Sequence, residues 1–209
     1  MDLFEEGIER ATEALEIHER LGDTVGQAEC LINLAGSLHG DKRFDAAEEA
    51  ASRAVSLLPE EGKQSLVCES HTLLGKIYRS KNEQEKAIHH LEVALGIASL
   101  FNWHNNLFWI HYNLAWPCID KDRLDDVQVH IERAKSHAVA NRAYSLCFVM
   151  LLQAVVWYKQ GRHEEAMSEV LRAVDACEKL GIADGAEACR TLAQRIQKET
   201  ARLPLVNSP

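Results

Sequence analysis

Apolar positions in this chain recur with the period of an α-helix and, on a larger scale, with a period of about 40 residues. Within single segments, large apolar side chains return at i, i+3, i+4 and i+7, which is the spacing of one helix face. On the larger scale, one pattern of small residues appears four times in succession. The first small residue of the pattern falls at Ala35, Gly75, Ala115 and Ala154, and the second at Ala54, Ala94, Ala134 and Ala173.

Each period predicts two antiparallel helices that pack closely at these small residues. A larger side chain at a helix crossing would separate the axes or strain the core, at a cost of roughly 1–3 kcal/mol. The predicted fold class is all-α, a right-handed α-solenoid of antiparallel helix pairs with about ten helices. We expect one domain over residues 1–203 and a disordered tail over 204–209. The expected units are a half-repeat over 3–21, repeats over 24–60, 64–100, 104–140 and 143–180, and a C-terminal helix over 184–201.

Composition and charge narrow the classes of function. The 209 residues include only 11 Gly and 4 Pro, which favours helices over a turn-rich all-β fold. The 23 Lys and Arg against 32 Asp and Glu give a net charge of −9, so the chain has no general attraction to nucleic acids or anionic membranes. Six scattered cysteines without a Cys-x-x-Cys motif read as reduced thiols, and the acidic N-terminus is unlike a signal peptide. We therefore expect a cytoplasmic protein.

The repeat resembles the tetratricopeptide repeat (TPR) family. Its motif is matched best over residues 31–59 and 71–94, and the resemblance implies a TPR-like superhelix. The period of about 40 exceeds the 34 residues that are usual in that family and implies helices about three residues longer. HEAT repeats share the longer period but lack this spacing of small residues. In the third repeat, Pro117 is expected to remove a backbone hydrogen bond and to kink its helix.

A narrower resemblance concerns the segments 45–54, 85–90, 101–104 and 108–113. The sequences of these segments resemble those of the repeat arms of fungal multidomain P-loop ATPases of the NACHT/STAND type. In that family the repeats form a C-terminal sensor or interaction arm, so the resemblance implies an arm of a larger signalling protein. No phosphate-binding loop accompanies it, because the Gly62-Lys63-Gln64-Ser65 segment lacks the upstream glycine.

Ten histidines and six cysteines are residues that could bind a metal ion or take part in catalysis. The adjacent His89 and His90 point about 100° apart on a helix, and His130 and His137 are two turns apart. No zinc-binding or hydrolase motif occurs. We therefore expect no metal, no cofactor and no enzyme. An active site assembled from a Cys, a His and a carboxylate that meet only in space stays open as a third alternative.

The resemblance implies a binding groove along the first helix of each pair. In the family, asparagines at such positions bind the peptide backbone, which is the expected role of Asn33 and Asn113. Lys76 and Arg79, three apart on one helix, are suited to hold a carboxylate. The aromatic residues at 109, 112 and 116 fit a groove or a core stripe equally well. The predicted groove residues are Asn33, His39, Lys76, Arg79, Trp109, Tyr112, Asn113, Trp116, Tyr158 and Lys159.

These features predict a protein-interaction module or scaffold that binds a peptide or helix of a partner protein. An alternative is a structural segment that self-associates. Its terminal half-repeats would complete each other between chains, and this heterologous contact would produce a head-to-tail homo-oligomer.

Overall fold

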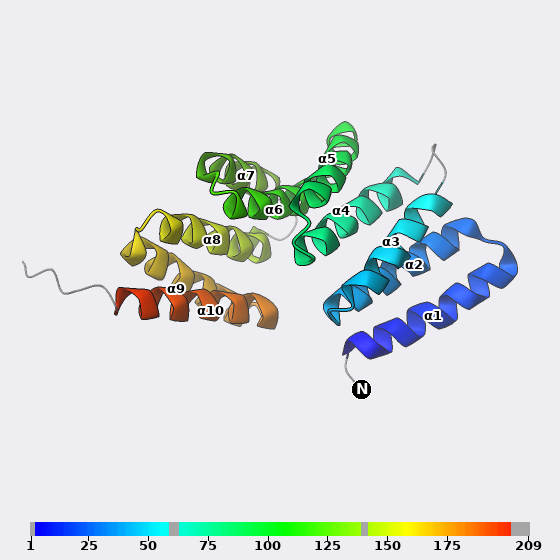
Figure 1. Ribbon diagram of the computed structural model, residues 1–209, viewed down its shortest axis with the longest axis horizontal. Coiled ribbons are helices and arrows are strands. Elements are labelled where there is room, and N and C mark those ends of the chain that lie inside the picture. The colour runs from blue at the N-terminus through cyan, green and yellow to red at the C-terminus, as the bar shows by residue number, and fades with distance from the viewer. Residues whose placement is uncertain (1–2, 59–62, 139–141, 202–209) are drawn as a thin grey trace, which may run out of the picture. The chain divides into compact units, whose positions relative to one another are not determined.

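The computed structural model describes residues 3–58, 63–138 and 142–201, and ten α-helices account for nearly all of them (Figure 1). No strand occurs in these ranges. The expected tail over 204–209 lies outside them. The helices are α1 (Leu3–Leu21), α2 (Thr24–Gly40), α3 (Phe44–Leu57), α4 (Gln64–Ser80), α5 (Gln84–Leu100), α6 (His104–Asp120), α7 (Leu124–His137), α8 (Arg142–Lys159), α9 (His163–Lys179) and α10 (Ala183–Thr200).

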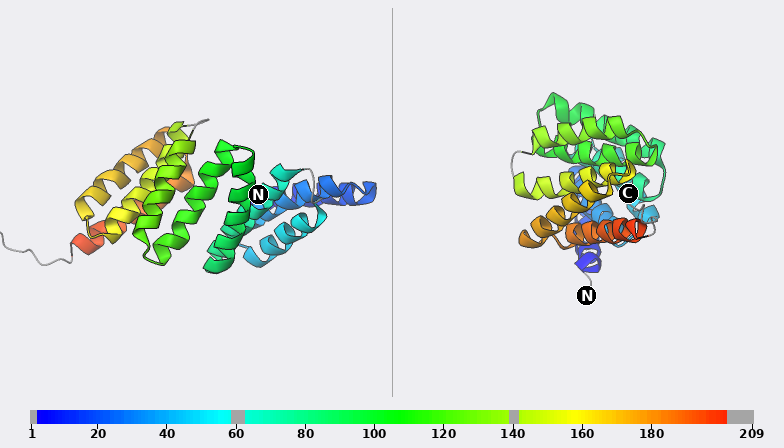
Figure 2. Two further views of the ribbon diagram at one scale, coloured as in Figure 1. Left: turned by 90° about the horizontal axis from the view of Figure 1, so that it is seen from above. Right: turned by 90° about the vertical axis from the view of Figure 1, so that its left-hand side faces the viewer.

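The chain divides into two compact units, Met1–Asn113 and Leu114–Pro209. In the first unit each helix from α1 to α5 packs against the next, and α2 also contacts α4. In the second unit α7, α8, α9 and α10 pack in the same sequential way, and α8 also contacts α10 (Figure 2). Ten helices in sequential antiparallel pairs confirm the predicted all-α, TPR-like fold class. The expectation of a single domain stays a prediction.

The recurring small residues lie at helix contacts, as their spacing predicts. Gly75 on α4 shows the reason: a β-carbon there would come within 2.5 Å of Leu91 Cγ and 3.3 Å of the Ala87 carbonyl oxygen, both on α5. Close approach of the two helices therefore depends on the missing side chain. The other small positions are all fully buried, at Ala35, Ala54, Ala94, Ala115, Ala134, Ala154 and Ala173.

The turns within pairs also repeat with the period. Each places one residue in the left-handed region, with φ of 62° at Lys42, 62° at Asn82, 56° at Asp122 and 76° at Gly161. The following amide then donates back across the helix end, as from Glu83 N to Tyr78 O at 2.8 Å. This hydrogen bond satisfies a carbonyl that the last helical turn would otherwise leave unpaired.

Each unit has its own apolar core. In the first, large aliphatic side chains such as Leu31, Leu74 and Ile77 pack around the small residues. In the second, the core combines aliphatic side chains with the thiols of Cys147, Cys177 and Cys189. All six cysteines of the chain are free and buried.

The third repeat contains the proline that was expected to disturb its helix. α6 continues through Pro117 to Asp120, and the Pro117 carbonyl accepts a hydrogen bond from Lys121 N at 3.1 Å. The missing amide of Pro117 therefore does not end the helix at that residue. Whether α6 is kinked there stays a prediction.

Candidate functional site

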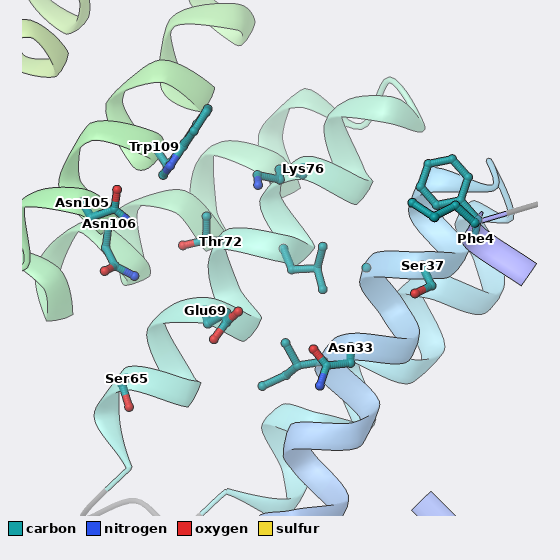
Figure 3. Close-up of a pocket in the computed structure, with 14 residues that line it drawn as sticks. Phe4, Asn33, Ser37, Ser65, Glu69, Thr72, Lys76, Asn105, Asn106 and Trp109 are labelled. Carbon is teal, nitrogen blue, oxygen red and sulfur yellow. The ribbon is translucent and has the colours of Figure 1, made fainter. Parts of the chain in front are cut away.

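Side chains from four helices surround a hollow of about 760 Å³ in the first unit (Figure 3). We call it the amide groove, after the three asparagines in its wall. Its polar lining is Asn33 and Ser37 from α2, Ser65, Glu69, Thr72 and Lys76 from α4, and Asn105, Asn106 and Trp109 from α6. The apolar part comes from Leu3 and Phe4 at the start of α1, together with Ile32 and Leu73.

Helix periodicity explains why these side chains share one surface. On α4, residues 69, 72, 73 and 76 follow the i, i+3, i+4, i+7 spacing of one face. A different side of α4 carries Leu74 and Ile77, which belong to the buried core. α4 thus presents a largely polar face to the hollow while its Leu74 and Ile77 side chains pack in the core.

Lys76 and Trp109 form one corner of the amide groove. The Lys76 ammonium lies 5.8 Å from the centre of the Trp109 ring, within the range of a cation–π contact. Tyr112 meets the same indole edge to face at 5.7 Å. Burial, followed by the nearby Arg79 charge, lowers the pKa of Lys76, whereas Glu69 opposes this shift. A carboxylate placed at this corner would relieve the repulsion between the two cations.

His39 lies near the cationic end of the groove, close to Lys76 and Arg79. Its Nε2 lies 2.9 Å from Ser80 Oγ, which joins α2 to the end of α4. Burial lowers the pKa of His39, and the charges of Lys76 and Arg79 lower it further. His39 is therefore kept neutral, and an anion bound at this end of the groove would be attracted by the charges of Lys76 and Arg79.

Asn113 departs from the predicted groove role. It is only 2% exposed, and its Nδ2 donates to the Trp109 carbonyl oxygen one turn earlier at 2.7 Å. Asn33, which occupies the same place two periods earlier, is exposed and lines the groove. The amide of Asn113 is instead part of the buried interior. Repeat position alone did not distinguish these two surroundings.

Three further predicted residues belong to the second unit. Trp116 is half-buried against that unit's core. Tyr158 is half-buried, with Arg195 Cζ 5.4 Å from its ring centre. Lys159 is exposed, and its Nζ lies 3.8 Å from Asp122 Oδ1. The structure thus brings Asn33, Lys76 and Trp109 into the amide groove and leaves these three residues outside it.

Sequence reasoning missed most of the polar lining. Ser65, Glu69 and Thr72 share one face of α4 with Lys76, so helix spacing alone would have added them to the groove. For Phe4, no spacing in the sequence indicated a place at the groove. Its ring packs directly over Gly40 of α2, where any side chain would collide with it. This contact places the start of α1 at the edge of the groove.

Two classes of site find no support among the described residues. Over residues 3–58, 63–138 and 142–201, no three His, Cys, Asp or Glu side chains converge so that they could hold a metal ion. None of the helices in the described part of the chain combines the length and apolar character needed to span a lipid bilayer.

Comparison with known proteins identifies the repeat. Residues 69–99, which cover most of α4 and α5, match the tetratricopeptide repeat model. No curated protein matches the chain.

Two solved structures share its fold. BtubC (BKLC) from P. vanneervenii is 18% identical, with a TM-score of 0.64 over 100% of this chain and 96% of that protein. Aspartyl phosphate phosphatase F from Bacillus subtilis is 16% identical, with a TM-score of 0.68 over 89% of this chain and 53% of its own. The match at 69–99 identifies one tetratricopeptide repeat in the chain, and the two structures show that the fold is TPR-like.

Proposed function

We propose that the amide groove binds an extended segment of a partner protein. The observation that carries this proposal is the meeting of Asn33, Asn105 and Asn106, from two different helices, at one hollow. An asparagine side chain both donates and accepts hydrogen bonds, and so it pairs well with a peptide group. A helical ligand already satisfies its own backbone, whereas an extended one leaves these groups available. The amides therefore favour an extended ligand over a helix.

The charges along α4 set the spacing of charged side chains in that segment. Lys76, with the Arg79 charge nearby, favours an acidic residue, and Glu69 favours a basic one. Glu69 and Lys76 are seven residues apart on the helix, which corresponds to about 10 Å. Three residues of polyproline II conformation span about 9 Å and return to the same side of the ligand. The proposed ligand therefore carries an acidic and a basic residue at positions i and i+3.

A peptide titration tests this proposal. Fluorescent eight-residue peptides with an acidic and a basic residue three apart, in both orders, are titrated against the full chain. We expect one order to bind, and the variants Lys76→Glu and Asn33→Ala to weaken that binding at least tenfold. Lys198→Glu, which makes the same charge change at an exposed position of α10, serves as the control and should bind like the wild type. Equal binding by all variants, or no binding by the wild type, contradicts the proposal.

Self-association is the second candidate. α1 exposes apolar side chains on the face away from the core, with Leu21 72% and Ile17 48% accessible. An exposed apolar stripe of this kind is a feature of association surfaces. Light scattering across a concentration series tests the candidate, because a constant monomer mass at high concentration contradicts it.

Three finer inferences complete the proposal. The chain is the interaction arm of a larger signalling protein, as its resemblance to the NACHT/STAND arms implies. It is not itself an enzyme, and it acts in the cytoplasm. These inferences rest on the sequence features and on the class of repeat, and the comparisons add no support for the fungal ATPase context.

A further inference from the structure

Two histidines on neighbouring helices of the tetratricopeptide repeat face each other. The Nδ1 atoms of His71 on α4 and His90 on α5 are 2.9 Å apart, and their ring centres are 5.1 Å apart. In this contact one ring donates its proton and the other accepts it. If both Nδ1 atoms carry a proton, no acceptor remains and two positive charges oppose each other. The contact therefore holds only while at least one of the two Nδ1 atoms is unprotonated.

The surroundings of the pair do not favour two charges. The His90 ring stacks on Tyr78 at 5.3 Å and 12°, and the Tyr78 hydroxyl donates to Glu48 Oε1 at 2.8 Å. The other carboxylate oxygen of Glu48 pairs with Lys81 Nζ at 2.5 Å. The charged and titratable groups around the pair are Asp45 and Glu48 on α3, Tyr78 on α4, Lys81 and Glu83 in the turn, and Lys86 and His89 on α5.

The balance of these groups favours neutral imidazoles. Burial, followed by the proximity of His71 and His89, lowers the pKa of His90 to about 4. Glu48 offsets only part of this shift. Burial also lowers the pKa of His71. In the unfolded chain both groups titrate near 6.5. The folded pair thus binds fewer protons than the unfolded chain between about pH 6.5 and 4, so its contribution to stability is complete above this window and is lost as the pH falls through it.

We propose that the His71–His90 contact is an acid-sensitive junction between α4 and α5, which separates when both imidazoles are protonated. α4 carries Glu69, Thr72 and Lys76, so the junction also supports one wall of the amide groove. Acid then loosens this helix pair before the rest of the chain. This loosening of α4 and α5 is inferred from the contacts of the helix pair and does not depend on any ligand. The expected loss of ligand binding in acid rests, in addition, on the proposed function of the groove.

Hydrogen exchange followed by mass spectrometry tests the junction on the full chain without any ligand. Protection factors of α4 and α5 are compared with those of α8 and α9 between pH 6.5 and 4.5, after correction for the intrinsic exchange rate. One differential proton changes an opening equilibrium by up to about tenfold per pH unit. We expect the protection of α4 and α5 to fall at least tenfold more than that of α8 and α9. An equal fall in both helix pairs overturns the proposal.

Matched variants assign the effect to the pair. His90→Gln keeps a polar side chain without a titratable ring, and the excess loss of protection should shrink below threefold. His104→Gln changes an exposed histidine on α6, outside the groups that surround the pair, and should behave like the wild type. If His90→Gln keeps the full excess loss, the proposal is wrong.

A second measurement needs no variant. In the wild-type protein, NMR titration of the His71 and His90 rings should show both protonating together with the loss of protection. Protonation of both rings without any loss of protection contradicts the junction. Failure of the peptide titration at pH 7 would remove the proposed ligand and leave this result unaffected.

Discussion

Gly75 lies so close to Leu91 that a β-carbon on the glycine would come within 2.5 Å of the leucine Cγ. Leu91 is fully buried, so its branch point has no free space into which it could move. The contact joins the two helices of one pair at the place where the 40-residue pattern has its small residue. It shows in atomic terms why that position stays small.

The first prediction follows from this contact. Gly75→Ala gains about 1 kcal/mol of helix propensity but adds strain of roughly 1–3 kcal/mol in a packed core. We expect a net loss of stability of about 1 kcal/mol, measured by urea unfolding. Gly96→Ala is the matched control, because nothing lies within 4 Å of a β-carbon at that position of α5. It should gain stability. A gain at Gly75 equal to that at Gly96 contradicts the packing described here.

The second prediction separates the two asparagines that repeat spacing treats alike. Asn113→Ala removes a buried hydrogen bond to the Trp109 carbonyl and should cost roughly 1–2 kcal/mol of unfolding free energy. Asn33→Ala removes an exposed side chain and should stay within about 0.5 kcal/mol of the wild type. Thermal and urea unfolding of both variants measure the difference. Similar small effects in both would place Asn113 outside the core.

The third prediction concerns alkaline pH. Burial, together with its hydrogen bond to Glu48, raises the pKa of Tyr78 to about 12. The folded state therefore holds the phenol proton where the unfolded chain, with a pKa near 10, releases it. Stability from this group is complete below pH 10 and is lost as the pH rises toward 12.

Tyrosine absorbance at 295 nm measures this shift. The wild type should show a late step that is smaller in Tyr78→Phe, where Tyr158, whose pKa is also raised by burial, still contributes. The variant should be less sensitive to alkali between pH 10 and 12. Tyr144→Phe provides a control at another tyrosine and should retain the late step. A wild-type titration without the late step contradicts the predicted environment of Tyr78.

The fourth prediction concerns the thiols. All six are buried, and burial raises the pKa of Cys147 to about 11, with Cys177 adding to the shift. A thiol reagent attacks the thiolate, so both access and ionisation are suppressed in the folded protein. We expect six reactive thiols in denaturant and a reaction at least a hundredfold slower without it. A thiol that reacts at once in native buffer would contradict its buried placement.

Much of the fold could be predicted from the sequence, because close helix packing requires small residues at regular intervals. Small residues at Ala35 and Gly75 mark contacts that tolerate no larger side chain, and they recur with the period of the helix pairs. This constraint is local and repeats unchanged, so it is visible without an alignment.

The site was less predictable, because exposure depends on neighbours that the periodic pattern does not encode. Lys76 and Trp109 were expected at the groove and line it. Asn113 was expected there and is buried. His71 and His90 contact each other from two different helices. They are 19 residues apart in the sequence, and no motif links them. Only their three-dimensional packing shows that they meet.

The turns at Lys42, Asn82 and Asp122 share one backbone conformation at intervals of 40 residues. Deleting residues 43–82 would join Lys42 to Glu83 and leave a turn of unchanged geometry. An inserted copy of the block would form the same junction. Gene-level duplication or loss of whole blocks therefore changes how many helices are available to contact a ligand without requiring a new connection to evolve.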